Sequence, residues 1–277
     1  MKKTKNFFKN LTWFDYSMLF IVFTLFSISF IFFYRKGEQI TIRVKVTDQE
    51  ILYAENYPQN WFANRFKVGD VEKDALGRVV SEVVNVETFS IDNKRKAVYL
   101  DLAVKATYDS RSKLYSTKGK SLVFGVPLRF NLSGIVFDAI ITEFPDSKYQ
   151  ENLEITDKIA TVIIRGAEEA KKAVEPRVVG SLKKGDRIVD SNGNVLAEIT
   201  DVKITPAERV VRTDRGDLLL RLDPLYKDAL VTLKVRTKIF NNEEYIFDDF
   251  PLRVGELLPL SFNQVFVEST IVEIRSE

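Results

Sequence analysis

Lys67-Val68-Gly69-Asp70 and Lys183-Lys184-Gly185-Asp186 decide the fold, because the same residues follow both stretches at the same spacing. Gly69 and Gly185 are 116 positions apart, and this interval holds without a gap across eight matched pairs. The pairs are Lys67/Lys183, Gly69/Gly185, Asp70/Asp186, Asp74/Asp190, Gly77/Gly193, Val79/Val195, Glu82/Glu198 and Val86/Val202. Self-similarity at a fixed interval is the signature of a structural unit used more than once. It predicts two copies of one β-rich module.

Two later matches extend the repeat towards the C-terminus. Pro127-Leu128-Arg129 returns as Pro251-Leu252-Arg253 at an interval of 124, and Asp138–Glu143 returns as Glu268–Glu273 at an interval of 130. The growing interval predicts short insertions in the second copy. We expect the first β-module at residues 39–145 and the second at 155–277, divided by a charged stretch near residues 145–154.

Alternation of apolar and polar residues predicts the strands. It runs through residues 39–46 and 96–106, as in half-buried strands. Asn192-Gly193 predicts a tight hairpin, because both positions tolerate a positive φ. Residues 218–222 and 230–235 are expected as two further, separate strands.

Helices are expected to be few and short. One is predicted within residues 48–66, and another over residues 166–174, ended by Pro176. The predicted fold class is therefore mainly β. An N-terminal transmembrane helix is followed by two tandem, homologous small β-barrel or sandwich modules, each with a short helix.

The repeated glycines and aspartates are interpreted as a structural turn motif. The glycines are expected to supply positive φ angles, and the aspartates to accept hydrogen bonds from turn N–H groups. Its members are Gly69, Asp70, Asp74, Gly77, Gly185, Asp186, Asp190 and Gly193. Asp190–Asn194 is similar to the start of a calcium loop, but the sixth position lacks Gly and the twelfth carries Asp201 in place of Glu. We predict no metal site.

Composition excludes several kinds of chemistry. The chain has no Cys and no His, which excludes thiol nucleophiles, Ser-His-Asp triads and zinc sites built on those ligands. Glu82 and Glu198 are the candidates for a carboxylate pair, but each is interpreted as an exposed strand position. We predict no enzyme and no cofactor. A net charge of +2 gives no indication of nucleic-acid binding.

Residues 16–34, YSMLFIVFTLFSISFIFFY, contain no charged residue. Their length suits a hydrocarbon core of about 30 Å crossed at about 1.5 Å per residue. Residues 1–15 carry four lysines and are expected in the cytoplasm, with the modules outside. The alternative is a cleaved signal peptide, whose apolar region would be shorter and would end at a small-x-small site. We expect an uncleaved anchor.

Five aromatic residues outside the anchor have two open interpretations. They pack in the core, or they form a surface for a partner. They are Trp61, Phe62, Phe240, Tyr245 and Phe247.

The run Lys183–Ile199, which contains Gly185-Asp186 and Asn192-Gly193, resembles domain-of-unknown-function family 4330. Trp13-Phe14-Asp15, where the apolar run begins, is also similar to that family. The resemblance covers residues 11 to about 90 and about 158 to 205. It implies a membrane-anchored bacterial envelope protein with a β-module after one helix, and it implies no activity. Two modules in one chain depart from that pattern.

A looser similarity is to the mammalian-cell-entry lipid-transport proteins, which also place a β-barrel after one anchor helix. Glu82 and Glu198 stand where Gly-x-Val is expected in those proteins. The likeness is therefore one of architecture, which does not fix function.

The expected function is a non-catalytic structural or adaptor subunit of a cell-envelope assembly, single-pass in the plasma or inner membrane. Its expected partners are other envelope proteins or a second copy of itself. The alternative is an envelope lipid- or glycan-binding or transport module.

Overall fold

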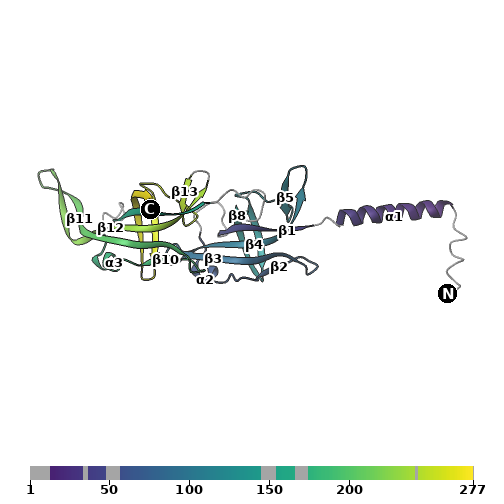
Figure 1. The fold of residues 1–277 in the computed structure, drawn as a ribbon, viewed down its shortest axis with the longest axis horizontal. Coiled ribbons are helices and arrows are strands. Elements are labelled where there is room, and N and C mark those ends of the chain that lie inside the picture. The colour runs from purple at the N-terminus through teal and green to yellow at the C-terminus, as the bar shows by residue number, and fades with distance from the viewer. Residues whose placement is uncertain are drawn as a thin grey trace. The chain divides into compact units, whose positions relative to one another are not determined.

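The computed structural model describes residues 13–33, 37–47, 57–144, 154–165, 174–240 and 243–276 (Figure 1). They belong to two compact units. One unit comprises residues 1–39 and 105–122, and the other comprises residues 40–104 and 123–277. The helix expected over residues 166–174 and the predicted module boundary lie almost wholly outside the described residues.

The first unit contains α1 (Trp13–Phe33) and a small hairpin of β5 (Leu114–Thr117) and β6 (Lys120–Ser121). The hairpin pairs with the end of β4 (Lys96–Asp109). Among the residues described, no helix combines the length and the hydropathy needed to cross a membrane.

Most strands of two eight-stranded sheets lie in the second unit. The first sheet runs β2-β3-β4-β1-β8-β7, with β5 and β6 attached to β4. The second runs β10-β11-β12-β9-β16-β15, with β13 and β14 attached to β12. The remaining bounds are β1 (Glu38–Thr47), β2 (Val71–Lys73), β3 (Val79–Ser90), β7 (Pro127–Leu132), β8 (Ile135–Glu143), β9 (Glu154–Ile164), β10 (Arg187–Val189), β11 (Val195–Arg212), β12 (Leu218–Phe240), β13 (Glu243–Ile246), β14 (Phe250–Pro251), β15 (Leu257–Phe262) and β16 (Val265–Ser276).

The two sheets therefore have the same strand order, element for element. Strands hold 62% of the chain, one sheet is a nearly closed barrel and the other is a half-barrel. In the first sheet the Ser133 N–H donates to the Val71 carbonyl at 2.9 Å, which links the β7–β8 turn to the far edge strand. The mainly β, barrel-like fold is confirmed. That the sheets descend from one duplicated module stays a prediction.

The two sheets also share one hydrophobic core. Phe89 and Tyr99 of the first sheet belong to the same buried cluster as Val231, Ile246 and Phe247 of the second. Burial of apolar surface stabilises a fold by about 25 cal/mol per Å². The sheets are consequently parts of one packed body.

Register places the extra residues of the second sheet in one hairpin. Ser81 pairs with Val104 in the first sheet, and Ala197 pairs with Val235 in the second. The intervening chain spans 23 positions in the first case and 38 in the second. The expected strands at 218–222 and 230–235 are in fact one strand, β12, and with β11 it continues beyond the sheet as a two-stranded arm (Figure 1).

Two other details differ from expectation. Pro251 lies in β14 and pairs with Tyr245, whereas Pro127 lies in β7 and pairs with Ile140, so the match between these prolines is wrong. Pro176 begins helix α3 (Pro176–Gly180). Proline is tolerated at the first helical position because its missing N–H would have no partner there. The helix expected within residues 48–66 is α2 (Asn60–Ala63).

Candidate functional site

The four motif glycines all have positive φ. The angles are +88° at Gly69, +78° at Gly77, +90° at Gly185 and +84° at Gly193. A Cβ added at any of them would meet no atom within 4 Å. Glycine is therefore required by the backbone conformation and not by a lack of space.

The motif aspartates accept hydrogen bonds from turn N–H groups in the same way in both sheets. Asp74 Oδ1 accepts from Leu76 and Arg78, each at 2.9 Å. Asp190 Oδ1 accepts from the N–H groups two and four residues ahead, each at 2.8 Å. The hydrogen bond from the Arg78 N–H is the main cause that lowers the pKa of Asp74. Asp70 and Asp186 each accept from the N–H three residues earlier.

The second of these turns makes contacts that the first does not. The Ser191 N–H donates to the Thr88 carbonyl at 2.9 Å, and the Thr88 N–H donates to Ser191 Oγ at 2.9 Å. Ser191 Oγ donates to the Val86 carbonyl at 3.1 Å. In the first turn Leu76 is 75% exposed. The β10–β11 turn thus docks on β3 of the other sheet.

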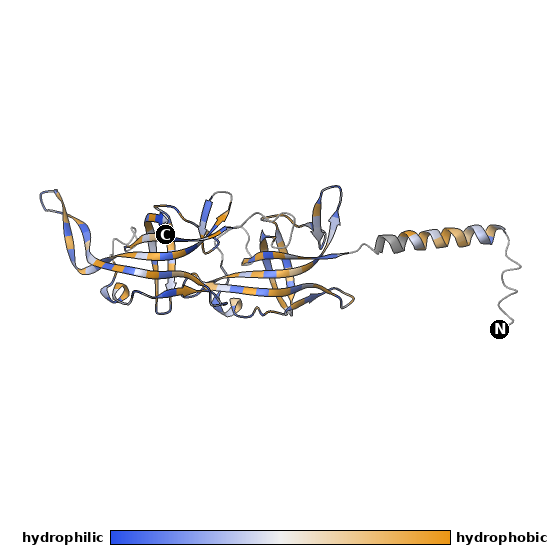
Figure 2. Cartoon of the chain, viewed as in Figure 1, coloured by the Kyte–Doolittle hydropathy of each residue, from blue (hydrophilic) through white to orange (hydrophobic). Residues whose placement is uncertain are grey.

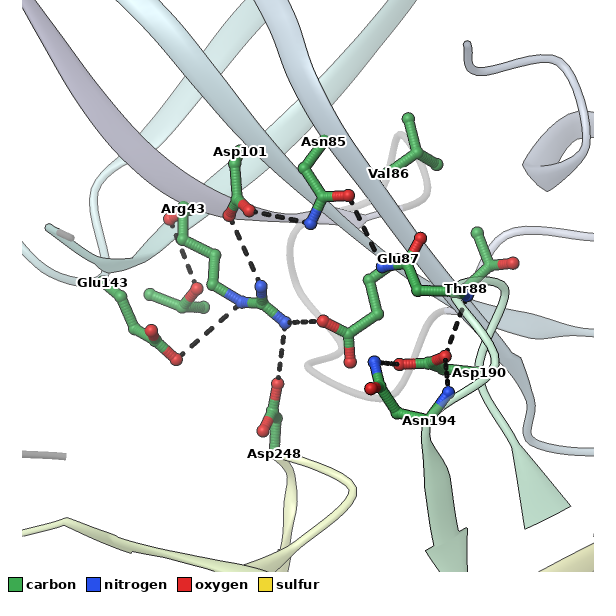
Figure 3. A network of polar contacts seen from close by, with 12 residues as sticks. Arg43, Asn85, Val86, Glu87, Thr88, Asp101, Glu143, Asp190, Asn194 and Asp248 are labelled. Atoms are coloured by element: carbon green, nitrogen blue, oxygen red, sulfur yellow. Dashed lines mark hydrogen bonds and ion pairs between the residues drawn. The ribbon is translucent and has the colours of Figure 1, made fainter. Parts of the chain in front are cut away.

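The Arg43 cluster lies beside this contact. It consists of Arg43, Glu87, Asp101, Glu143 and Asp248 (Figure 3). The guanidinium of Arg43 is 2.5 Å from Glu87, 3.1 Å from Asp248, 3.4 Å from Asp101 and 3.8 Å from Glu143, and its side chain is only 9% exposed. Asp248 belongs to the second sheet and the other four residues to the first. The cluster therefore joins the two sheets.

Burial alone would lower the pKa of the Arg43 guanidinium. The charges of Asp248, Glu87 and Glu143, with the hydrogen bond to Glu87, outweigh burial and raise that pKa. Arg43 stays charged, and its fork of donors suits several carboxylates at once. Its guanidinium also lies 5.0 Å from the centre of the Tyr99 ring.

Two lysines extend the cluster. Lys238 Nζ lies 2.7 Å from Asp248 and 3.3 Å from Glu143, and Lys45 Nζ lies 2.7 Å from Asp249. Burial first, and then the charges of Asp249 and Asp248, raise the pKa of the Tyr99 hydroxyl well above its usual value. The phenol therefore remains neutral.

Asp248 reaches Arg43 from a strained turn. Phe247 and Asp248 have φ values of +54° and +62° in the loop between β13 and β14. Such angles in residues other than glycine cost on the order of 1–3 kcal/mol each. Phe247 packs 5.5 Å from the Phe89 ring, and Asp248 pairs with Arg43. Contacts with the first sheet offset the strain.

Sequence reasoning missed the Arg43 cluster. Arg43 lies 44 and 205 positions from Glu87 and Asp248, so no local pattern connects them. One usable signal was present. The corresponding turn of the first sheet contains Lys118-Gly119, and glycine suits a turn with positive φ angles. The second sheet has Phe247-Asp248 in that turn, a pair that such a turn does not favour.

The five aromatic residues singled out earlier do not form one surface. Trp61 and Phe62 line a cavity of about 180 Å³ beside Pro58 and Phe137. Phe240 and Tyr245 line another, mostly apolar, cavity of about 270 Å³ between β12, β13 and the first sheet. Phe247 is buried and is a core residue.

A further cavity, of about 250 Å³, adjoins the Arg43 cluster and is lined by Arg236, Lys238 and Asp190 among others. Glu82 and Glu198 do not converge there or elsewhere. Each lies on a strand, and Glu198 pairs with Arg187 at 3.0 Å. No group of three or more potential metal ligands occurs in the described part of the chain.

Outside α1, an uncovered apolar surface lies on the arm of β11 and β12. Val210, Leu218, Leu220 and Leu222 are 63–69% exposed. Val210 pairs with Leu220, and Leu222 and Leu218 flank Leu220 at alternate positions. Directly paired and alternate residues share one face of a β-ribbon. These four residues, the leucine face, were not singled out from the sequence, because the arm was not expected.

The fold and these sites define a class: a mainly β protein whose two barrel-like sheets are joined by a buried ion cluster and carry an apolar arm. The family described as Domain of unknown function (DUF4330) matches residues 132–275, more than half of the chain. The protein belongs to this family. The matched residues include 158–205 of the expected resemblance but not 11–90. No curated protein and no solved structure matches.

Proposed function

We propose that the protein is a membrane-tethered, non-catalytic adaptor that holds an envelope assembly together through its arm. The observation that carries this proposal is the uncovered leucine face. Contiguous apolar patches larger than a few hundred Å² are rare on monomeric soluble proteins, and larger ones commonly mark interaction sites. An isolated two-stranded ribbon is also only marginally stable in water, so a partner on the arm would stabilise it.

The Arg43 cluster supports an architectural role. Its carboxylates are engaged by Arg43 and Lys238. Such a cluster fixes the orientation of one sheet against the other, as an adaptor requires. The chain has no His or Cys, so imidazole and thiol chemistry is excluded.

The tether is proposed from α1 and its sequence. Residues 16–34 have no charge, and most side chains described along α1 after Asp15 are apolar and exposed (Figure 2). Part of this run lies outside the residues whose side chains are described. We expect the protein to resist carbonate extraction, to need detergent and to keep its original N-terminus. Release by carbonate with a shortened N-terminus would overturn the tether.

Native purification from membranes tests the adaptor role. The wild-type chain is expected to copurify with stoichiometric partner chains, or as an oligomer, and Leu220→Asp is expected to lose them. Leu219→Asp is the matched control, because Leu219 lies on the opposite face of the same strand. If both variants retain every component of the wild-type sample, the arm is not the contact and the proposal fails.

A second candidate function is binding of an envelope lipid. The apolar cavity of about 270 Å³, lined by Phe124, Ile141, Phe240 and Tyr245, favours it. Its volume is close to the lower limit of ordinary small-molecule sites, about 300 Å³. Mass spectrometry of the detergent-purified protein is expected to detect bound lipid if this candidate is right. Ile141→Trp would fill the cavity and should displace that lipid.

A further inference from the structure

The arm presents two different faces. Within the arm, residues 208–212 of β11 and 218–222 of β12 pair only with each other among the described strands. The leucine face also carries Glu208 opposite Leu222 and Arg212 opposite Leu218, so one charge stands at each end of it. The reverse face carries Arg209, Arg221, Val211 and Leu219. Figure 2 shows this mixture of apolar and polar residues along the arm.

A lipid surface does not suit the arm. The turn that closes it is Thr213-Asp214-Arg215-Gly216-Asp217, so its tip is charged. Charged side chains in the hydrocarbon region cost several kcal/mol each. Over residues 208–221 four arginines are nearly balanced by three acidic residues, which gives little attraction to an anionic headgroup layer. A protein partner with apolar and mixed-charge character fits better.

We propose that a second copy of this chain covers the arm, with the two leucine faces stacked and their strands antiparallel. This inference rests on the proposed function, because it names the partner of the same arm. A two-fold axis between the faces places Val210 over Val210 and Leu220 over Leu220 of the partner. Leu218 then lies over Leu222 of the partner. All four apolar residues leave water at once, at the usual sheet-to-sheet separation of about 10 Å.

Charge complementarity favours this occupant. The same axis places Glu208 of each copy over Arg212 of the other, and this occurs twice per dimer. Stacking the arms parallel would instead place each Glu208 near an apolar residue. A single sequence therefore supplies both halves of the contact, as an isologous interface requires.

The contact that joins the two sheets of one molecule cannot be repeated between molecules to give a head-to-tail assembly. It depends on Arg43 in β1 and on Phe247-Asp248 in the β13–β14 turn. By register Thr161 occupies the position of Arg43 in the second sheet, since Arg43 pairs with Glu143 and Thr161 with Glu273. Lys118-Gly119 occupies the turn of the first sheet. The Arg43–Asp248 ion pair therefore cannot be repeated between copies of the chain.

Charge reversal in the full-length protein, purified in detergent, tests the dimer. Light scattering after size exclusion is expected to give a dimer for the wild-type chain. Glu208→Arg and Arg212→Glu should each weaken dimerisation at least about tenfold, since like charges would then face each other. The double variant restores opposite charges and should return to within about threefold of wild type. A monomeric wild-type chain, or a double variant weaker than both single variants, overturns the proposal.

Cross-linking gives an independent readout, because the chain has no cysteine of its own. Val210→Cys should yield a covalent dimer with a short bis-maleimide, and Arg221→Cys, on the reverse face, should not. Equal cross-linking of both variants would overturn the stacked arrangement.

The outcomes separate this inference from the proposed function. If the chain is monomeric but Leu220→Asp loses other envelope proteins, the dimer is wrong and the adaptor role stands. If the dimer behaves as described but no assembly depends on the arm, the dimer stands and the adaptor role fails. Binding of anionic vesicles by a monomer, abolished by Leu220→Asp, would replace both with a lipid contact.

Discussion

Arg43 is a charged residue whose side chain is almost completely buried. An uncompensated buried charge is unfavourable by several kcal/mol, so the surrounding carboxylates are a condition of its burial. The reverse also holds for the carboxylates, because Glu87 and Asp248 are only 17% and 14% exposed and rely on Arg43 and, for Asp248, also on Lys238 at 2.7 Å. Each charge of the cluster therefore offsets part of the cost of burying the others.

Replacing Arg43 by Met is therefore expected to destabilise the protein by about 3–5 kcal/mol, since the carboxylates would be left buried without their main cation. Chemical denaturation of the full-length protein measures the change. Arg275→Met is the control. Arg275 pairs with Glu273 at 2.8 Å, but both side chains are about half exposed or more, so the loss should be at most about 1 kcal/mol. Equal losses for the two variants would contradict a joining role for Arg43.

Asp223 provides a pH-dependent contribution at the base of the arm. The N–H groups of Tyr226 and Leu225 donate to its carboxylate at 3.0 and 2.9 Å, and Arg209 lies 3.3 Å away. The hydrogen bonds, the one from Tyr226 first, lower the pKa of Asp223 below its usual 3.8. A lowered pKa in the folded state adds stability that is present above the unfolded value and is lost as pH falls through the folded value.

Wild type should accordingly be more stable than Asp223→Asn at neutral pH, and the difference should shrink only below about pH 4. Denaturation midpoints of both proteins from pH 7 down to pH 3 measure it. Subtracting the variant removes the contributions of Asp74 and Asp92, whose pKa values are also lowered. A difference that disappears between pH 7 and pH 5 would rule out Asp223 as the titrating group.

At the scale of single residues, local chemistry was predictable and distant pairing was not. Asn192-Gly193 and the repeated Gly-Asp pairs identified the turns, because positive φ and N–H acceptance are local requirements. Arg43 looked like the outward position of an alternating strand. Its burial depends on a turn more than 200 positions later, which period-two patterning does not reveal.

The sequence of the β13–β14 hairpin favours contact with the first sheet over the stability of the hairpin itself. A turn with two positive φ angles is best made by Asn-Gly. Phe247-Asp248 accepts the strain and gains a core aromatic and an ion pair in the other sheet. The presence of Phe247-Asp248 in this turn is explained by the contacts that these two residues make with the first sheet.

Changing Phe247-Asp248 to Asn-Gly therefore tests which effect is larger. Turn strain of about 1–3 kcal/mol per residue would be relieved, but loss of a buried phenylalanine costs about 3–5 kcal/mol and the Arg43 ion pair is lost in addition. A net destabilisation of a few kcal/mol is expected in chemical denaturation. The same change made in Lys118-Gly119, to Asn-Gly, is the control and should be nearly neutral. A stabilised double variant would show that relief of turn strain outweighs the lost contacts with the first sheet.

The arm illustrates why one element escaped prediction. Leu218–Leu222 has the composition of a strand, and Thr213–Asp217 has that of a turn. The local sequence does not distinguish a strand inside a sheet from one that continues beyond it. The difference lies in the number of neighbouring strands, which local sequence does not reveal. The second sheet does hold extra residues, and register places them in this one hairpin, whereas several short insertions were expected.

For the molecule as a whole, repeated strand order coexists with a single core. Phe89, Tyr99 and Phe247 pack together across the sheets, and the Ser191 and Arg43 contacts add polar connections between them. Two barrel-like sheets that met only through a linker would unfold separately. Because the two sheets share one hydrophobic core, unfolding of one sheet would expose the buried side of the other.

The two sheets are therefore expected to unfold in one cooperative transition. With Trp13 replaced by Phe, fluorescence comes from Trp61 alone, which lies in α2 next to the bridge between Gln59 and Arg95 at the first sheet. Hydrogen exchange measured on peptides from β4 and β12 follows each sheet directly. Fluorescence and both sets of peptides should give the same midpoint in denaturant, and Arg43→Met should lower all of them together. Wild-type β12 peptides that exchange at a lower denaturant concentration than β4 peptides would mean that the shared core contributes little, and that each sheet is stable by its own packing.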